Sequence, residues 1–212
     1  MNWAAVFVVF MVIFTMFSSS GQSPSYQVLK SAPSPLLSTM NVRDQYLPTG
    51  SEIPTYNSAD LNAYQVIISY IMDNYKKVYL ADVLSIAENI VNYCAEHNID
   101  PLFITAVIAV ESEFNKNAVS SSGAKGLGQL MPFNLRSYKV EDPFDIQQNV
   151  RASVLMIKGL LVMWKGDVSY ALASYFEGEN AIKRKKESGF SPKTTQYVYR
   201  ILSVYDKIKQ YL

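Results

Sequence analysis

The chain has 212 residues, 49% of them hydrophobic, so its length and composition suit one ordinary domain with a sizeable core. Lys plus Arg total 19 against 18 for Asp plus Glu, which excludes the strongly basic surface typical of nucleic-acid-binding proteins. A single cysteine, Cys94, and a single histidine, His97, exclude a disulfide framework and the usual multi-cysteine or two-histidine metal sites. We expect no metal and no cofactor.

The first element is the uncharged apolar run WAAVFVVFMVIFTMF at residues 3–17. The run is shorter than the roughly 20 residues of a membrane span and suits the apolar core of a signal peptide, residues 1–20, with cleavage before Gly21. No Lys or Arg precedes the run, so an uncleaved anchor in the inner membrane stays open as the alternative. Both alternatives export the rest of the chain to the periplasm or cell envelope.

Residues 21–58 are rich in Ser, Pro, Thr and Asn and show no lasting helical or strand period, which predicts a flexible linker. Apolar residues then recur at helical spacing. We expect a first helix with Asp60 as its N-cap and a second helix from about Leu80 to His97. Cys94 lies on the apolar stripe of the second helix, which indicates core packing.

The remaining helices are predicted from their start signals. Asp100 is expected to cap a third helix that has Pro101 in its first position. A long helix starts near Asp145, Asp167 caps the next one, and Ser191 starts the last. No convincing alternating strand separates these segments, so the sequence predicts an all-α globule of about seven helices spanning residues 59–212.

The stretch AVIAVESEF places the carboxyl group of Glu111 at the end of an apolar helix. Apolar surroundings disfavour the charged form of a carboxyl and raise its pKa, which keeps a glutamate protonated for general acid catalysis at neutral pH. Glu113, two positions on, points to a different side of the helix and is expected to be a surface charge.

Several dispersed blocks resemble the soluble lytic transglycosylases, lysozyme-like enzymes that cut bacterial peptidoglycan. The resemblance covers about residues 80–212. It rests on ESEFN from Glu111, SSSGAKGLGQLMP from Ser120, Asn149 early in the long helix, ASYFEG from Ala173 and TTQYVYRIL from Thr194.

The resemblance implies a lysozyme-like all-α fold with a glycan-binding groove, and a monomer that acts on peptidoglycan glycan strands. The expected reaction cleaves the β-1,4 bond between N-acetylmuramic acid and N-acetylglucosamine and forms a 1,6-anhydro product, with Glu111 as acid and then base. The family tyrosine whose hydroxyl holds the catalytic glutamate corresponds to Tyr175. The other substrate-binding positions are Ser120, Gln129, Met131 and Tyr197.

Five positions depart from the family pattern. Gly128 stands where methionine is usual, and we expect it to remove a thioether from the cleft wall and to add backbone freedom. Lys116 replaces a proline on the surface, Phe176 replaces Asn, Glu177 replaces Ala, and Thr194 stands where a glutamate often occurs. None of these changes removes Glu111. They leave two alternatives open, a peptidoglycan-binding scaffold with weakened catalysis and a lysozyme-type hydrolase.

Overall fold

The computed structural model describes residues 57–185 and 189–212, which belong to one compact unit, Asn57–Leu212. The expected signal peptide or anchor, residues 1–20, and residues 21–56 of the expected linker lie outside the described residues. Within the two described ranges, no helix combines the length and the hydropathy needed to cross a bilayer. The all-α prediction is confirmed, because these ranges contain helices and two isolated β-bridges but no strand.

Eight helices occur in the described residues, against about seven expected. In chain order they are α4 (Ser58–Asn74), α5 (Leu80–His97), α6 (Pro101–Ser112), α7 (Pro132–Ser137), α8 (Ile146–Met163), α9 (Val168–Glu177), α10 (Glu179–Arg184) and α11 (Pro192–Lys209). The sequence did not predict the short helices α7 and α10.

Side-chain caps fix where most of these helices begin. Asp100, Asp145, Asp167 and Ser191 each accept a hydrogen bond from a backbone N–H in the first turn, as their positions in the sequence predicted. The prediction for α4 was wrong by three residues. Asn57 is the N-cap, and it accepts a bond of 2.9 Å from the backbone N–H of Asp60.

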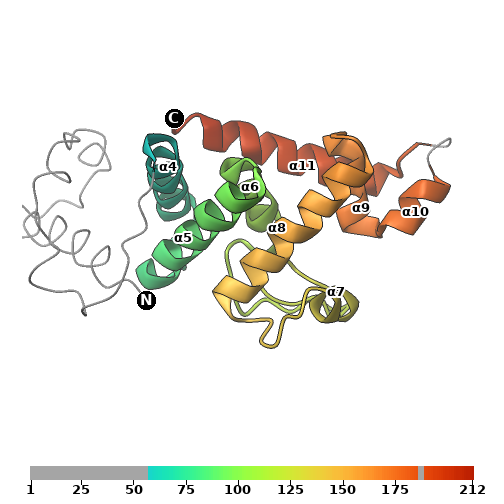
Figure 1. Ribbon diagram of the computed structural model, residues 1–212, viewed down its shortest axis with the longest axis horizontal. Helices are drawn as coiled ribbons and strands as arrows, with labels where there is room; N and C mark the ends of the chain where they lie inside the picture. The colour runs from blue at the N-terminus through green and yellow to red at the C-terminus, as the bar shows by residue number, and fades with distance from the viewer. Residues whose placement is uncertain (1–56, 186–188) are drawn as a thin grey trace, which may run out of the picture. The chain divides into compact units, whose positions relative to one another are not determined.

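Helix α6 is the centre of the unit. Every side chain from Leu102 to Ala109 is buried, which is the pattern of a helix covered on all sides. Figure 1 shows α5 and α8 running side by side and α11 crossing near α4 and α6. The buried Cys94 of α5 confirms its predicted place in the core.

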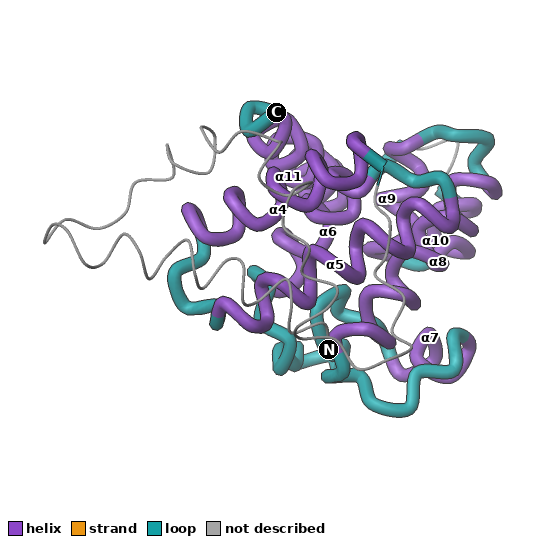
Figure 2. The backbone as a smooth tube through the Cα atoms, turned by 60° about the vertical axis from the view of Figure 1, so that its left-hand side comes forward, coloured by secondary structure: helices purple, strands orange, loops and turns teal. Residues whose placement is uncertain are grey.

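Long connections flank α7 and gather at one end of the unit, as Figure 2 shows. The connection from α6 to α7 contains both bridges, Val119 with Lys125 and Lys125 with Leu130. Glycine and serine residues thus form a hydrogen-bonded loop here, and this loop follows directly after the helix that carries Glu111.

Candidate active site

Glu111 lies in the last turn of α6, immediately before a sharp reversal of the chain. Glu113 and Phe114 both adopt left-handed backbone conformations, with φ of 52° and 60°. Such angles are unfavourable for a bulky side chain, so packing must hold them. Phe114 is 1% exposed, and its ring meets that of Tyr75 edge-on at 4.9 Å between centroids. Glu113 is exposed, as predicted.

The carboxyl group of Glu111 is partly buried and bonded to one phenol. The Tyr197 hydroxyl donates a hydrogen bond of 2.5 Å to Glu111 Oε1. Burial raises the pKa of Glu111 to about 7 from the ordinary 4.5, although the bond from Tyr197 and the charge of Arg200 both act to lower it. Desolvation therefore dominates, as the apolar run before Glu111 led us to expect.

Arg200 influences the pKa of Glu111 and was not predicted from the sequence. It lies three residues after Tyr197 on α11, and residues three apart share one face of a helix. That spacing was the available signal. The cation favours the ionised form of Glu111, which keeps the pKa near neutrality rather than higher.

The expected role of Tyr175 is wrong in one respect. Its hydroxyl donates to the carbonyl oxygen of Gly128 at 2.7 Å, whereas the hydroxyl that holds Glu111 belongs to Tyr197. Tyr175 still lies near Glu111. Burial is the main cause of the raised pKa of the Tyr175 phenol, and the charge of Glu111 is the second cause. The structure therefore brings Glu111, Tyr197 and Tyr175 together.

The other predicted binding residues lie in the loop between α6 and α7 and mainly hold its shape. Ser120 Oγ accepts a bond of 2.9 Å from the backbone N–H of Ala124. The Gln129 amide nitrogen donates to the carbonyl oxygens of Ala118 and Gly126, at 3.2 and 3.0 Å. Met131 precedes α7 and is 42% exposed.

Asn149 of α8 holds the loop between α6 and α7 in place through its side-chain amide. It is 1% exposed, accepts from the Gly128 N–H at 2.8 Å, and donates to the carbonyl oxygens of Lys125 and Pro143. An ideal Cβ on Gly126, whose φ is +75°, would lie 2.1 Å from the Asn149 amide nitrogen. Asn149 thus has a structural role in this loop.

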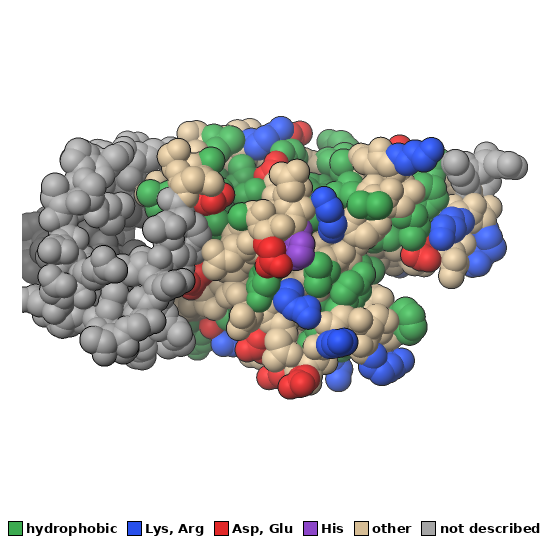
Figure 3. All heavy atoms as spheres, in the orientation of Figure 1, with side chains coloured by type: hydrophobic (Ala, Val, Ile, Leu, Met, Phe, Trp, Pro, Cys, Tyr) green, Lys and Arg blue, Asp and Glu red, His purple; other side chains and the backbone are tan. Residues whose placement is uncertain are grey.

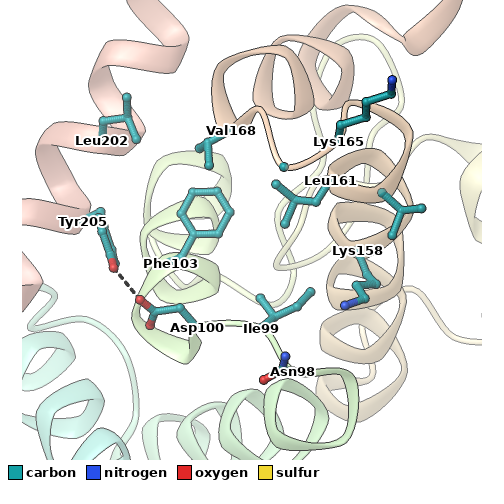
Figure 4. A pocket seen from close by; sticks show the side chains of 12 residues that line it. Asn98, Ile99, Asp100, Phe103, Lys158, Leu161, Lys165, Val168, Leu202 and Tyr205 are labelled. Carbon is teal, nitrogen blue, oxygen red and sulfur yellow. Dashed lines mark hydrogen bonds between the residues drawn. The ribbon is translucent and has the colours of Figure 1, made fainter.

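The surface is hollowed between the part that carries α7 and the part that carries α9 and α10 (Figure 3). A separate cavity of about 580 Å³ lies around the first turn of α6, where Phe103 points into it and Lys158 and Lys165 lie at its edge (Figure 4). None of the predicted site residues lines this second cavity. In the described part of the chain, no group of three His, Cys, Asp or Glu side chains is arranged to hold a metal ion.

Comparison with known families identifies the family of this chain. The family model described as the transglycosylase SLT domain matches residues 88–198, more than half of the chain. The chain belongs to the transglycosylase SLT family. The matched range contains Glu111, Tyr175 and Tyr197, together with the whole loop between α6 and α7.

Two curated SLT relatives give the extent of the similarity. A transglycosylase of Enterobacteria phage PRD1 is 32% identical over 108 residues, covering 51% of this chain and 38% of the relative. Membrane-bound lytic murein transglycosylase D of Escherichia coli K12 is 31% identical over 156 residues, covering 63% of this chain and 34% of the relative. The chain thus spans little more than a third of the length of these relatives.

Solved SLT structures share the fold. A structure of an inactive glutamate-to-glutamine mutant of the lytic transglycosylase Slt from Pseudomonas aeruginosa aligns with a TM-score of 0.53 and 20% identity. The alignment covers 70% of this chain and 28% of that one. At this identity the likeness establishes the helical fold alone.

One departure from the SLT pattern, Gly128, has a direct packing reason. An ideal Cβ on Gly128 would lie 1.9 Å from Ser153 Oγ and 2.9 Å from the Tyr175 hydroxyl. Helix α8 and Tyr175 therefore leave no room for a side chain. The sequence analysis expected Gly128 to add backbone freedom, which is wrong, because its N–H and carbonyl are both hydrogen-bonded and the residue is buried.

Proposed function

We propose that this chain is an exported peptidoglycan lytic transglycosylase with Glu111 as its general acid and then its general base. It cleaves the β-1,4 bond between N-acetylmuramic acid and N-acetylglucosamine and leaves a 1,6-anhydro end. Residues 1–20 export or anchor the chain. Residues 21–56 form the linker, two residues shorter than the expected 21–58, because Asn57 and Ser58 begin α4, and residues 57–212 form the catalytic domain. The names of the similar proteins, lytic murein transglycosylases among them, support this substrate class.

The observation that carries the proposal is a glutamate with a pKa of about 7 whose Oε1 is held by a phenol. Because the Tyr197 hydroxyl donates to Oε1, the acidic proton of Glu111 belongs on Oε2. A carboxyl with this pKa is about half protonated at neutral pH and loses its proton readily, which suits an acid that must later act as a base.

The reaction balances without water. Glu111 Oε2 gives its proton to the glycosidic oxygen, and the bond from that oxygen to C1 of N-acetylmuramic acid breaks. The N-acetyl oxygen of the same sugar assists by bonding to C1. The C6 hydroxyl oxygen then displaces it at C1 and closes the anhydro ring, while its proton returns to Glu111. Attack from within the same sugar gains from proximity, which contributes several kcal/mol.

The glycan strand is proposed to lie in the hollow beside α7, α9 and α10. The exposed Met131 side chain is free to contact sugar rings there. Ser120 has a hydroxyl hydrogen to donate, because its oxygen acts as acceptor toward Ala124. Gln129 has an amide oxygen to accept with, because its nitrogen makes both of its described bonds. Tyr175 contributes to the wall by fixing Gly128.

Digestion of purified peptidoglycan sacculi, with mass analysis of the released muropeptides, tests the proposal. Anhydro products from the wild-type chain are expected, and Glu111→Gln should lower the rate by about 10²–10⁴-fold, the range for loss of a general acid. Glu111→Gln keeps an oxygen for Tyr197, and its unfolding transition checks that it is folded.

Other outcomes select the alternatives. Reducing sugar ends would identify a lysozyme-type hydrolase in place of a lytic transglycosylase. Retention on sacculi with no soluble product would identify a binding scaffold. Equal cleavage by wild-type and Glu111→Gln proteins would exclude Glu111 from the chemistry.

A further inference from the structure

Phe176 and Tyr197 form a stacked pair of aromatic rings next to Glu111. Their centroids lie 4.5 Å apart and their planes differ by 19°. Phe176 comes from the last turn of α9, and Tyr197 from the second turn of α11. Tyr197 is 9% exposed and Phe176 37% exposed, so Phe176 is the outer ring of the pair. It covers the phenol whose hydroxyl donates to Glu111.

The residue after Phe176 ties the end of α9 to the start of α11. Glu177 Oε1 accepts bonds from the hydroxyls of Ser191, at 3.2 Å, and of Thr194. Glu177 Oε2 accepts a bond of 2.5 Å from the Lys185 ammonium group. We call Glu177, Lys185, Ser191 and Thr194 the Glu177 cluster. Because Ser191 also caps α11, the cluster fixes the helical turn that precedes Tyr197.

These contacts involve three of the five departures from the family pattern. The pattern has Ala and Glu where this chain has Glu177 and Thr194, so the carboxylate that usually comes from α11 comes here from α9. Glu177 and Thr194 bond to each other. Phe176, in place of Asn, supplies a ring to Tyr197. The substitutions at positions 177 and 194 therefore compensate each other, and Phe176 adds a separate contact between the same two helices.

We propose that Phe176 is a positioning residue for the Glu111 carboxyl, acting through the ring and hydroxyl of Tyr197, while the Glu177 cluster holds α9 and α11 in place. The proposal rests on the proposed function and explains why the departures preserve catalysis. A ring stacked face to face restricts rotation of the Tyr197 side chain, so its hydroxyl stays within bonding distance of Oε1.

Phe176 also excludes water. It has no polar group of its own, and it shields a bond between a phenol and a carboxyl, which is stronger where water is scarce. Desolvation is the largest cause of the raised pKa of Glu111, so removing this cover should let water in and lower that pKa.

Direct titration tests the proposal without any assay of cleavage. The Glu111 pKa is measured by NMR in the full chain with carboxyl-labelled glutamate, in wild type, Phe176→Ala, Phe176→Tyr and Tyr199→Ala. Tyr199 is a matched control, an aromatic residue of α11 that is 72% exposed. Phe176→Ala should lower the Glu111 pKa, whereas Phe176→Tyr and Tyr199→Ala should leave it unchanged. Equal titration in all four proteins would overturn the proposal.

Kinetics on a soluble glycan oligomer give the second readout. Misplacement of a catalytic group by a fraction of an ångström to 1 Å costs up to about 100-fold, so Phe176→Ala should lower kcat by about 10- to 100-fold with KM changed less than about twofold. Phe176→Tyr should restore kcat. A rise in KM at unchanged kcat would show that Phe176 instead contacts the sugar, and would overturn the positioning role.

Two further results keep the proposals separable. If Phe176→Ala does not fold, Phe176→Leu takes its place, because it keeps apolar cover and loses the ring stack. Its kcat should fall at constant KM, and wild-type kcat would contradict the proposal. If the wild-type chain cleaves no glycan, the proposed function fails, while the titration still decides whether Phe176 controls Glu111.

Discussion

The two ends of α6 carry the same chemical pair in opposite surroundings. At the N-terminal end Asp100 accepts a bond from the Tyr205 hydroxyl, and at the C-terminal end Glu111 accepts one from the Tyr197 hydroxyl. Both tyrosines come from α11, which packs along α6. Asp100 is exposed, whereas Glu111 is partly buried and has a pKa of about 7. Figure 4 shows the Asp100–Tyr205 pair.

The two acids lie at opposite ends of the dipole of α6. Asp100 is the N-cap and also accepts the Leu102 N–H at 2.8 Å, so it lies at the positive end of the helix dipole and pairs one of the N–H groups of the first turn. Glu111 lies in the last turn, where the dipole and the free carbonyl groups disfavour a negative charge. A phenol partner alone therefore does not raise the pKa of an acid to near neutrality. The position of the acid along the helix and the burial of its carboxyl group have that effect.

The largest expected effect is on the pH dependence of cleavage. Glu111 must be protonated to act as an acid, and its pKa is about 7, so kcat/KM should fall about tenfold for each pH unit above that value. The measurement is a pH–rate profile on a soluble glycan oligomer. Asp100→Asn should keep the same alkaline limb. A wild-type profile that stays flat to pH 9 would contradict the claim that cleavage depends on protonated Glu111.

A second prediction is that the two acids affect stability with opposite signs. The folded pKa of Glu111 lies above its ordinary 4.5, so the folded state binds its proton more tightly than the unfolded state does. Stability from this group is complete below pH 4.5 and is lost as the pH rises to about 7. Glu111→Gln avoids that loss, and at pH 8 it should be more stable than wild type by about 1–3 kcal/mol.

Asp100→Asn is the matched control for that measurement. Asn caps a helix about as well as Asp but loses the charge at the positive end of the dipole, which costs about 0.3–1 kcal/mol. Urea unfolding of the three proteins at pH 4 and pH 8 measures the free energies. The gain from Glu111→Gln should disappear at pH 4, and a gain of equal size at both pH values would refute its electrostatic origin.

The sequence predicted the long helices better than the short ones for a physical reason. Asp100, Asp145, Asp167 and Ser191 begin helices with side chains whose capping role is local and readable. Helices α7 and α10 have six residues each and no side-chain cap. Pro132 begins α7, but six residues are too few to show a helical period, so the sequence marks neither helix clearly. Tertiary packing, rather than local sequence, determines where they form.

The candidate site shows the same limit. The apolar run before Glu111 predicted its raised pKa from local sequence. The partner of Glu111 is 86 positions away, and two tyrosines were available, so resemblance alone singled out Tyr175 for a bond that Tyr197 makes. Gly128 was misread because its neighbour Ser153 lies on α8, and no pattern around Gly128 reveals that contact.

The last expected effect is local to the loop wall beside Glu111. Gly128→Ala would place a Cβ 1.9 Å from Ser153 Oγ, so the loop must shift, at a cost of about 1–3 kcal/mol in the free energy of unfolding. Gly159→Ala on α8 is the control, because a Cβ there meets nothing within 4 Å, and alanine in a helix should add about 0.5–1 kcal/mol. Urea unfolding of both variants measures the two values.

A double variant locates the cause of that cost. Ser153→Ala removes the hydroxyl nearest the new Cβ, so Gly128→Ala combined with Ser153→Ala should recover part of the stability lost by Gly128→Ala alone. Because the Gly128 carbonyl accepts the bond from the Tyr175 hydroxyl, Gly128→Ala should also disturb the Glu111 end of α6 and spare the Asp100 end. Full additivity of the two substitutions would mean that Ser153 does not restrict Gly128, and that the wall beside Glu111 is less tightly packed than the distances indicate.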